Sequence, residues 1–286
     1  MLKIESAQNA TFKKLANLTS AKGLKKENLL LLSGAKLIDE YIALPHIKRP
    51  LKIIYEIVTP RMSVLTEVLG TRAPPVIQLS AELFAQLDAL GTRHNILVLE
   101  QPPMPILEAK DFARYTPRGL EVVIPVGDPG NLGALIRSCE AFGVPRVILT
   151  REAAHPFLPR AIKASAGSVL RVPLSQGPEL SAFPENCIAL DKDGTPVQDF
   201  KWPARGLLVV GEEGPGLGGH GPRFRQRIGI PTERVESLNV SVAAGIALAY
   251  RAQRSAKRRR ASALVRMQSA QAAEEHADHD AGTEGD

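Results

Sequence analysis

Along the chain, runs of consecutive apolar residues alternate with segments in which apolar residues recur at helical spacing. This alternation predicts strands followed by helices. Runs of consecutive apolar residues, such as Leu29–Leu32, are typical of strands buried on both faces. Between these runs, apolar residues recur at helical spacing, as Phe12, Leu15 and Leu18 do. Strands that alternate with helices predict a compact α/β/α domain. For the first part of the chain, the pattern predicts strands at 29–32, 53–58, 76–79 and 96–99 and helices at 6–19, 35–43 and 81–90.

A proline-rich segment then interrupts the pattern. Pro102, Pro103 and Pro105 lie close together, and proline fits neither a helix interior nor a central strand, because it has no amide proton and a fixed φ. The expected organisation is a first domain at 1–105, a linker at about 101–118 and a second domain at 119–255.

The second domain is again expected to be α/β. Its strands are apolar throughout, as in a parallel sheet that helices cover on both faces. Asp128 to Asn131 has the composition of a turn, and Gly143 suits the end of the helix that follows. The pattern predicts strands at 121–127, 147–149, 188–190, 207–210 and 228–230 and helices at 132–142 and 240–256.

Composition narrows the function classes. The net charge is +6 and the pI is about 9.4, which suits a polyanionic partner. Basic residues gather towards both ends of the pattern, before Lys36 and after Arg251, whereas the acidic segment 261–286 has no apolar pattern and is expected to be disordered. The two cysteines, Cys139 and Cys187, have no metal-ligand spacing, so neither a metal site nor a disulfide is expected.

The same sequence gives no sign of a membrane or of secretion. No apolar run reaches the length of a membrane helix, and the first residues lack the apolar core of a secretion signal. The expected location is therefore the cytoplasm, and no membrane partner is expected.

Three segments of the second domain carry candidate chemistry. In the first, Asp128 to Arg137, a strand runs into a turn and then a helix start, which offers free backbone N–H groups and the Asn131 amide at the edge of the sheet. In the third, residues 230–245, a strand ends in a polar loop, and Ser237 or Asn239 caps a helix rich in small residues. Taken singly, each segment also fits an ordinary capped helix.

The second segment, residues 209–217, places glycines after a buried strand, where a ligand can approach the backbone. Gly214 to Gly219 also matches the GxGxxG pattern of dinucleotide-binding proteins, with Glu233 further along. That pattern requires a helix to begin at the glycines, and the following Gly-Gly-His-Gly-Pro cannot propagate one. The nicotinamide interpretation is therefore disfavoured.

In combination, the three segments resemble the signature motifs of the SpoU/TrmH family of SPOUT-class RNA 2′-O-ribose methyltransferases. The resemblance covers about 119–255 and rests on NLGALIRSCEAFG, VVGEEGPGL and IPTERVESLNVSVAAGIALAYRA, with a further family-like segment at 163–168. The first domain resembles, more weakly, the ribosomal-protein-like RNA-binding domain of the family, through SAQNATFKKLANL and LLLLSGAKLIDEYI. Ser33 departs from this pattern, because the family usually has a glutamate before the glycine.

The resemblance implies a ribosomal-protein-like α/β/α RNA-binding domain and a trefoil-knotted α/β methyltransferase domain that acts as a homodimer. It implies S-adenosyl-L-methionine as the cofactor, held near Gly211, Ile230 and Leu238. It also implies a catalytic set of Arg137, Asn131, Glu213, Ser237 and Asn239. Because an arginine is effectively always protonated, Arg137 is expected to hold a phosphate or the developing alkoxide rather than to act as a base.

Other functions remain open at this point. The two-domain layout favours ribosomal RNA, by analogy with the family alone. The alternatives are a transfer RNA 2′-O-methyltransferase, a catalytically inactive RNA-binding relative and a nicotinamide-binding oxidoreductase.

Overall fold

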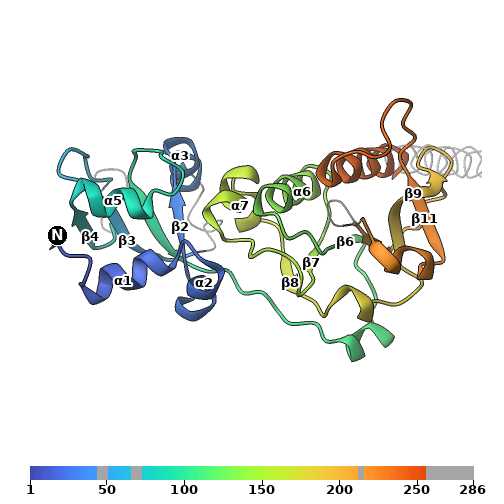
Figure 1. Cartoon of the computed structure of the whole chain (residues 1–286), viewed down its shortest axis with the longest axis horizontal. Helices are drawn as coiled ribbons and strands as arrows, with labels where there is room; N and C mark the ends of the chain where they lie inside the picture. The colour runs from blue at the N-terminus through green and yellow to red at the C-terminus, as the bar shows by residue number, and fades with distance from the viewer. Residues whose placement is uncertain (44–50, 66–72, 212–215, 256–286) are drawn as a thin grey trace, which may run out of the picture.

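The computed structural model describes residues 1–43, 51–65, 73–211 and 216–255, which form two sheets joined by a linker (Figure 1). The first sheet is mixed and has the order β1-β4-β3-β5-β2. β4 is parallel to β1 and β3, and β5 is antiparallel to β3 and β2. Its strands are β1 (Leu2–Ile4), β2 (Leu29–Ser33), β3 (Ile53–Val58), β4 (Val76–Leu79) and β5 (Ile96–Glu100).

The helices of this first unit correct the prediction of one long helix at 6–19. The helix in that range covers only 10–17, because Asn9 caps its start. A further helix that the pattern did not predict follows it, capped by Ser20, and a Cβ atom on its Gly23 would lie 1.9 Å from the carbonyl oxygen of Asn17. The predicted helix at 81–90 ends early, where the Asp88 carboxylate accepts hydrogen bonds from the next loop. The helices are α1 (Ala10–Asn17), α2 (Ala21–Glu27), α3 (Ala35–Ala43) and α5 (Ala81–Leu87).

The linker packs along the surface of the second unit. Ile106 forms a bridge to Gln176, and a 3-10 helix, η3 (Ala109–Ala113), follows. Tyr115 then donates a hydrogen bond to the fully buried carboxylate of Glu121. Burial and this carboxylate raise the pKa of Tyr115 to about 12, so the linker is anchored at the start of the second sheet by a neutral phenol.

The second sheet is parallel throughout and has the order β11-β9-β10-β6-β7-β8. This confirms the predicted parallel α/β architecture, with two additions that the hydrophobic pattern was too short to reveal, β8 and α7. The strands are β6 (Leu120–Ile124), β7 (Val147–Leu149), β8 (Leu174–Gln176), β9 (Ile188–Pro196), β10 (Gly206–Val209) and β11 (Gln226–Gly229). The helices are α6 (Pro129–Ala141), α7 (Pro159–Ala164) and a C-terminal helix at 240–255.

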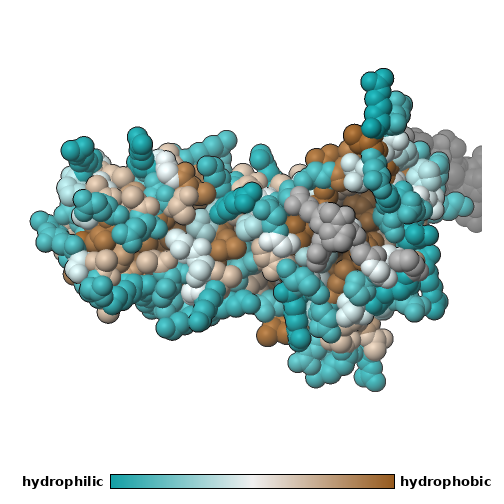
Figure 2. Space-filling view, viewed as in Figure 1, coloured by the Kyte–Doolittle hydropathy of each residue, from teal (hydrophilic) through white to brown (hydrophobic). Residues whose placement is uncertain are grey.

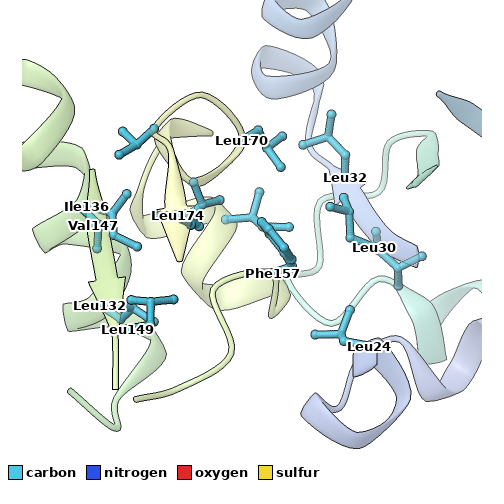
Figure 3. Packing of buried hydrophobic residues seen from close by; sticks show 14 of the residues in the cluster. Leu24, Leu30, Leu32, Leu132, Ile136, Val147, Leu149, Phe157, Leu170 and Leu174 are labelled. Atoms are coloured by element: carbon cyan, nitrogen blue, oxygen red, sulfur yellow. The ribbon is translucent and has the colours of Figure 1, made fainter. Parts of the chain in front are cut away.

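The two units share one hydrophobic core. Leu24, Leu30 and Leu32 of the first unit face Phe157 and Leu170 of the second (Figure 3), and all of them belong to a single buried cluster. β2 is buried along its whole length although it is an edge strand of its sheet, because α7 contacts it. The two sheets are therefore packed against each other and not merely tethered.

Two sequence expectations lie partly or wholly outside the described residues. The tail at 261–286 is one of them. The course of the chain after β10 includes 212–215, so the trefoil knot stays a prediction. No helix of the described ranges combines the length and the apolarity needed to cross a bilayer.

Candidate active site

The three candidate segments follow three strands of the parallel sheet. β6 leads to Asp128, β10 to Gly211 and β11 to Ile230. Because parallel strands end at the same edge, these loops gather at the carboxyl edge, where open α/β sheets bind ligands. The fold thus brings together three segments that lie far apart in the sequence.

The first loop is a helix cap and not the predicted turn. Asp128 is the N-cap of α6, and its carboxylate accepts a hydrogen bond of 2.8 Å from the backbone N–H of Asn131. Pro129 occupies the first helical turn, where its missing N–H costs nothing. The helix therefore begins at 129 instead of 132, and Asn131 lies within its first turn. Arg160 pairs with Asp128 at 3.2 Å and supports this cap.

A side-chain hydrogen bond connects the first and third loops. Asn239 Nδ2 donates to Asn131 Oδ1 over 3.1 Å. The Asn239 Oδ1 atom accepts hydrogen bonds from the backbone N–H and the hydroxyl of Ser241, at 2.9 Å and 2.6 Å. Asn239 is thus the residue that caps the C-terminal helix, and it holds the N-termini of two helices side by side. Positive ends of two helix dipoles meet at this point.

The described residues on either side of 212–215, Gly211 and Gly216, lie close together. Gly211 is buried, and a Cβ atom there would lie 2.6 Å from the carbonyl carbon of Gly216. Gly216 has a φ of +60°, which favours glycine. The predicted catalytic residue Glu213 lies between these two glycines, outside the described residues.

The third loop offers unused backbone groups. Between 230 and 238, the described chain makes no backbone-to-backbone hydrogen bond. Ile230 and Leu238 are half-buried, and Ser237 is exposed. Such a loop has donors and acceptors available for a ligand, as does the close backbone approach at Gly211, so the residues present fit a cofactor that is bound mainly by backbone groups.

Arg137 lies apart from the other predicted catalytic residues. It is exposed on α6, six residues after Asn131. At 3.6 residues per turn, six residues correspond to about 120° around a helix and about 9 Å along it. Within this chain, Arg137 therefore turns away from Asn131 and Asn239, and it lines a pocket shared with Lys36 and Lys163. The sequence did not connect these two lysines with Arg137, because only the packing of the two units brings them together.

Two other chemistries gain no support from the geometry. The glycines at 216–219 lead into a short 3-10 helix, η6 (Gly218–Arg223), where a dinucleotide fingerprint requires an α-helix. Among the described residues, no group of three or more His, Cys, Asp or Glu side chains could hold a metal ion. Both cysteines are free and buried, and burial raises the pKa of Cys187 to about 12.

Comparison with known proteins supplies the family. The SpoU rRNA methylase family matches residues 121–249. A 23S rRNA (guanosine-2′-O-)-methyltransferase, RlmB of Acinetobacter baylyi, is 32% identical over 171 residues, which are 54% of this chain and 69% of that protein. The chain belongs to the SpoU rRNA methylase family. The family that the three motifs resemble is thereby confirmed.

Two further comparisons describe proteins that are named as ribosomal RNA methyltransferases. A ribosomal RNA small subunit methyltransferase G 2 of Syntrophobacter fumaroxidans is 35% identical over 86% of this chain, which spans only 48% of that relative. The crystal structure of an AdoMet-bound rRNA methyltransferase from Sinorhizobium meliloti has a TM-score of 0.68 at 23% identity, over 88% of this chain and 97% of that one. The shared fold thus extends over both sheets.

Proposed function

We propose that this chain is an S-adenosylmethionine-dependent RNA methyltransferase that modifies a ribose 2′-hydroxyl. The observation that carries the proposal is the Asn131–Asn239 hydrogen bond, which joins two helix N-termini at the carboxyl edge of the parallel sheet. The relative from Acinetobacter baylyi has this activity in its name, and the structure from Sinorhizobium meliloti contains AdoMet. Both support the proposal.

The cofactor is proposed to bind between the loop after β10 and the loop at 230–238. Gly211 lets the backbone approach closely, and the backbone groups of Ile230 and Leu238 are available for hydrogen bonds. When bound, the cofactor supplies an activated methyl group with a good leaving group. The task left to the protein is to position the ribose and to favour its alkoxide.

Polar side chains around this site are proposed to orient the ribose. Asn131 and Asn239 fix each other, and the exposed Ser237 lies two residues before Asn239. Glu213, on the loop after β10, belongs to the same proposed set. Since Asn131, Ser237 and Asn239 lie on loops or helix starts at one sheet edge, they can contact one bound nucleotide.

Arg137 is proposed to act electrostatically. A guanidinium is always charged and has no acceptor, so it stabilises an anion and cannot accept the proton. Its position on the side of α6 that faces the first unit favours a phosphate of the substrate as that anion.

The substrate is proposed to be ribosomal RNA, recognised partly by the first unit. Its exposed lysines, among them Lys13, Lys14 and Lys26, provide phosphate contacts. The relatives named above act on different ribosomal RNAs according to their names, one on the small subunit and one on 23S. A cytoplasmic location fits this substrate.

A homodimer is proposed through the exposed face of the C-terminal helix. The small residues of this helix pack within the chain: Ala244 and Ala247 are fully buried, and a Cβ atom on Gly245 would lie 3.5 Å from Ser138 Oγ on α6. The outward face carries Val242 and Tyr250 at helical spacing, which are 49% and 39% exposed. Figure 2 shows the resulting apolar surface over this helix.

The dimer is tested by light scattering on the full chain. Val242→Glu with Tyr250→Glu is expected to give a monomer, because charges on an apolar interface remain unpaired. Ile106→Glu, which also puts a charge on an exposed apolar residue, is the control and should stay dimeric. A wild-type chain that is monomeric at micromolar concentration would contradict the proposal.

The activity is tested with labelled methyl donor and total RNA, followed by nucleoside analysis. The expected product is a 2′-O-methylated nucleoside at one position. Calorimetry should show binding of S-adenosylmethionine by the protein. Binding of NADH in its place, or a methylated base, would refute the proposed chemistry.

Arg137→Ala is expected to reduce the single-turnover rate about 100-fold at saturating RNA, as loss of one preorganised group commonly does. The affinity for the cofactor should hardly change, because the pocket that Arg137 lines contains neither Gly211 nor Ile230 nor Leu238. Arg137→Lys should rescue poorly, since a point charge does not reproduce the planar fork. A mutant within a few-fold of wild type would remove Arg137 from the catalytic set.

A further inference from the structure

A pocket of about 720 Å³ lies at the junction of the two units. The turn from β2 to α3 forms one wall, with Ser33 and Lys36, and α6 and α7 form the other, with Arg137 and Lys163. Sites for small molecules typically measure roughly 300–1,000 Å³. The pocket is therefore of a size to take one nucleotide unit.

The lining is basic, and its positive charge is not all neutralised. Four basic and two acidic side chains line the pocket. Arg171 is fully engaged with one of the acids, since its Nε and Nη2 atoms donate to the Glu140 carboxylate over 2.6 Å and 2.8 Å. This contact lowers the pKa of Glu140, which stays ionised and bound to Arg171. The pair forms a fixed wall of no net charge.

The three other cations point to an anionic ligand. Arg137 and Lys163 make no ion pair with any described residue, and both are exposed. Lys36 has only a surface contact of 3.9 Å to Glu40 on its own helix, which contributes little. Since Arg137 and Lys163 have no ion-pair partner among the described residues, the positive charge left in this pocket favours a bound phosphate.

The remaining lining is suited to a sugar and a base. Leu37 and Leu90 are half-buried apolar side chains from the first unit, and Ser33 and Thr92 contribute hydroxyl groups. Apolar surface beside polar donors and a basic rim matches the composition of a nucleotide. An isolated inorganic anion would not need the apolar part.

We propose that this pocket binds a nucleotide of the substrate RNA next to the target, with its phosphate on Lys36, Lys163 and Arg137. This inference rests on the proposed function for the identity of the polyanion. α6 begins at the proposed methyl-transfer site with Asn131, and the pocket opens less than two turns further along the same helix. One RNA strand can thus occupy both sites and be held by both units at once.

The test is the salt dependence of binding of a labelled single-stranded oligoribonucleotide to the full chain. For single strands, each phosphate that is no longer neutralised reduces the magnitude of the slope of log K against log salt by about 0.7. Because Lys36 and Lys163 hold one phosphate together, Lys36→Ala with Lys163→Ala is expected to reduce this magnitude by up to about 0.7. Lys110→Ala is the control, because Lys110 lies in η3 of the linker, pairs with Glu108 and does not line the pocket; Figure 1 shows this part of the linker far from α3 and α7.

Thermal denaturation and calorimetric binding of S-adenosylmethionine verify that the double variant is folded. An unchanged slope in a folded double variant, or the same loss in Lys110→Ala, would overturn the pocket as an RNA site while leaving the methyltransferase proposal intact. A reduced slope together with no methylation by the wild-type chain would support the pocket and refute the proposed activity. A wild-type chain that does not bind the oligoribonucleotide would overturn both.

Discussion

At the scale of single residues, substitutions of Asn239 can distinguish its structural role as a helix cap from its proposed role in methyl transfer. Asn239 has two tasks: its carbonyl oxygen caps a helix, and its amide nitrogen binds Asn131. An aspartate at position 239 would keep the oxygen that caps the helix and would lose the amide N–H that donates to Asn131. This difference makes a single position able to report on both roles.

Asn239→Asp is expected to keep the melting temperature near that of wild type and to reduce methylation at least tenfold, because a carboxylate then faces the Asn131 oxygen. Asn239→Ala should lose the activity as well, and also about 1 kcal/mol of stability with the cap. Thermal denaturation and single-turnover methylation measure the two effects. Full activity in the aspartate variant would mean that Asn239 only caps the helix.

The sequence located those residues of the site whose position depends only on where a buried strand ends. Asn131, Gly211 and Asn239 lie in segments that follow buried strands, so the pattern places them at one sheet edge, whereas their functional roles came from the family resemblance. Asp128 was not recognised as the cap, since Asp-Pro-Gly-Asn suits a turn and a helix start equally well. Arg137 was placed in the same set by the family resemblance alone, and the pocket that it lines depends on the packing of the two units, which the sequence pattern does not show.

At the scale of elements, the loop after β10 depends on a glycine. Gly211→Ala is expected to weaken cofactor binding at least tenfold, because the new Cβ atom would lie 2.6 Å from the backbone of Gly216 and must displace the loop. Gly219→Ala is the control, since no atom lies within 4 Å of a Cβ placed there. Calorimetry compares the two affinities. Equal affinities in both variants would exclude this loop from the cofactor site.

The elements that the sequence did not reveal are short. β1, β8 and α7 have three, three and six residues, too few for a period of 2 or 3.6 to be recognised. Their existence depends on pairing with β4 and β7 or on packing against α6, which are contacts distant in sequence. The longer elements follow from their own periodicity, as β2, β3 and α3 do.

At the scale of the whole molecule, the shared core changes how the first unit should be tested. Removing residues 1–105 would expose Phe157 and Leu170, which are buried against Leu30 and Leu32 (Figure 3). The truncated chain would be destabilised whatever its RNA affinity. Substitution of surface lysines in the full chain is the cleaner experiment.

The junction also contains a histidine that couples stability to pH. His155 is 7% exposed, and its Nδ1 atom accepts a hydrogen bond from the Phe157 backbone over 3.3 Å. Burial, and secondarily the charge of Lys25 on the first unit, lowers its pKa to about 4. Between its ordinary value of 6.5 and this value, the unfolded chain binds a proton that the folded chain excludes. Stability therefore falls as the pH falls through this window.

From about pH 7 to about pH 5, this group should reduce the free energy of unfolding by about 2 kcal/mol at most. His155→Asn keeps an acceptor for the Phe157 amide and does not titrate. Urea denaturation at both pH values is expected to show a smaller acid loss in the variant than in wild type. Parallel losses in the two proteins would mean that His155 does not contribute.

The common core of the two units finally bears on how such a protein could acquire a new target. An exchange of the first unit alone would meet Phe157 and Leu170 with an unmatched surface, so we expect shuffling of this unit between relatives to fail. Evolution can instead change the exposed surface of the first unit, where the lysines face solvent, without disturbing the shared core. The first unit then keeps a fixed position relative to the second, and an RNA binds when its own folded shape lets it contact both units at once.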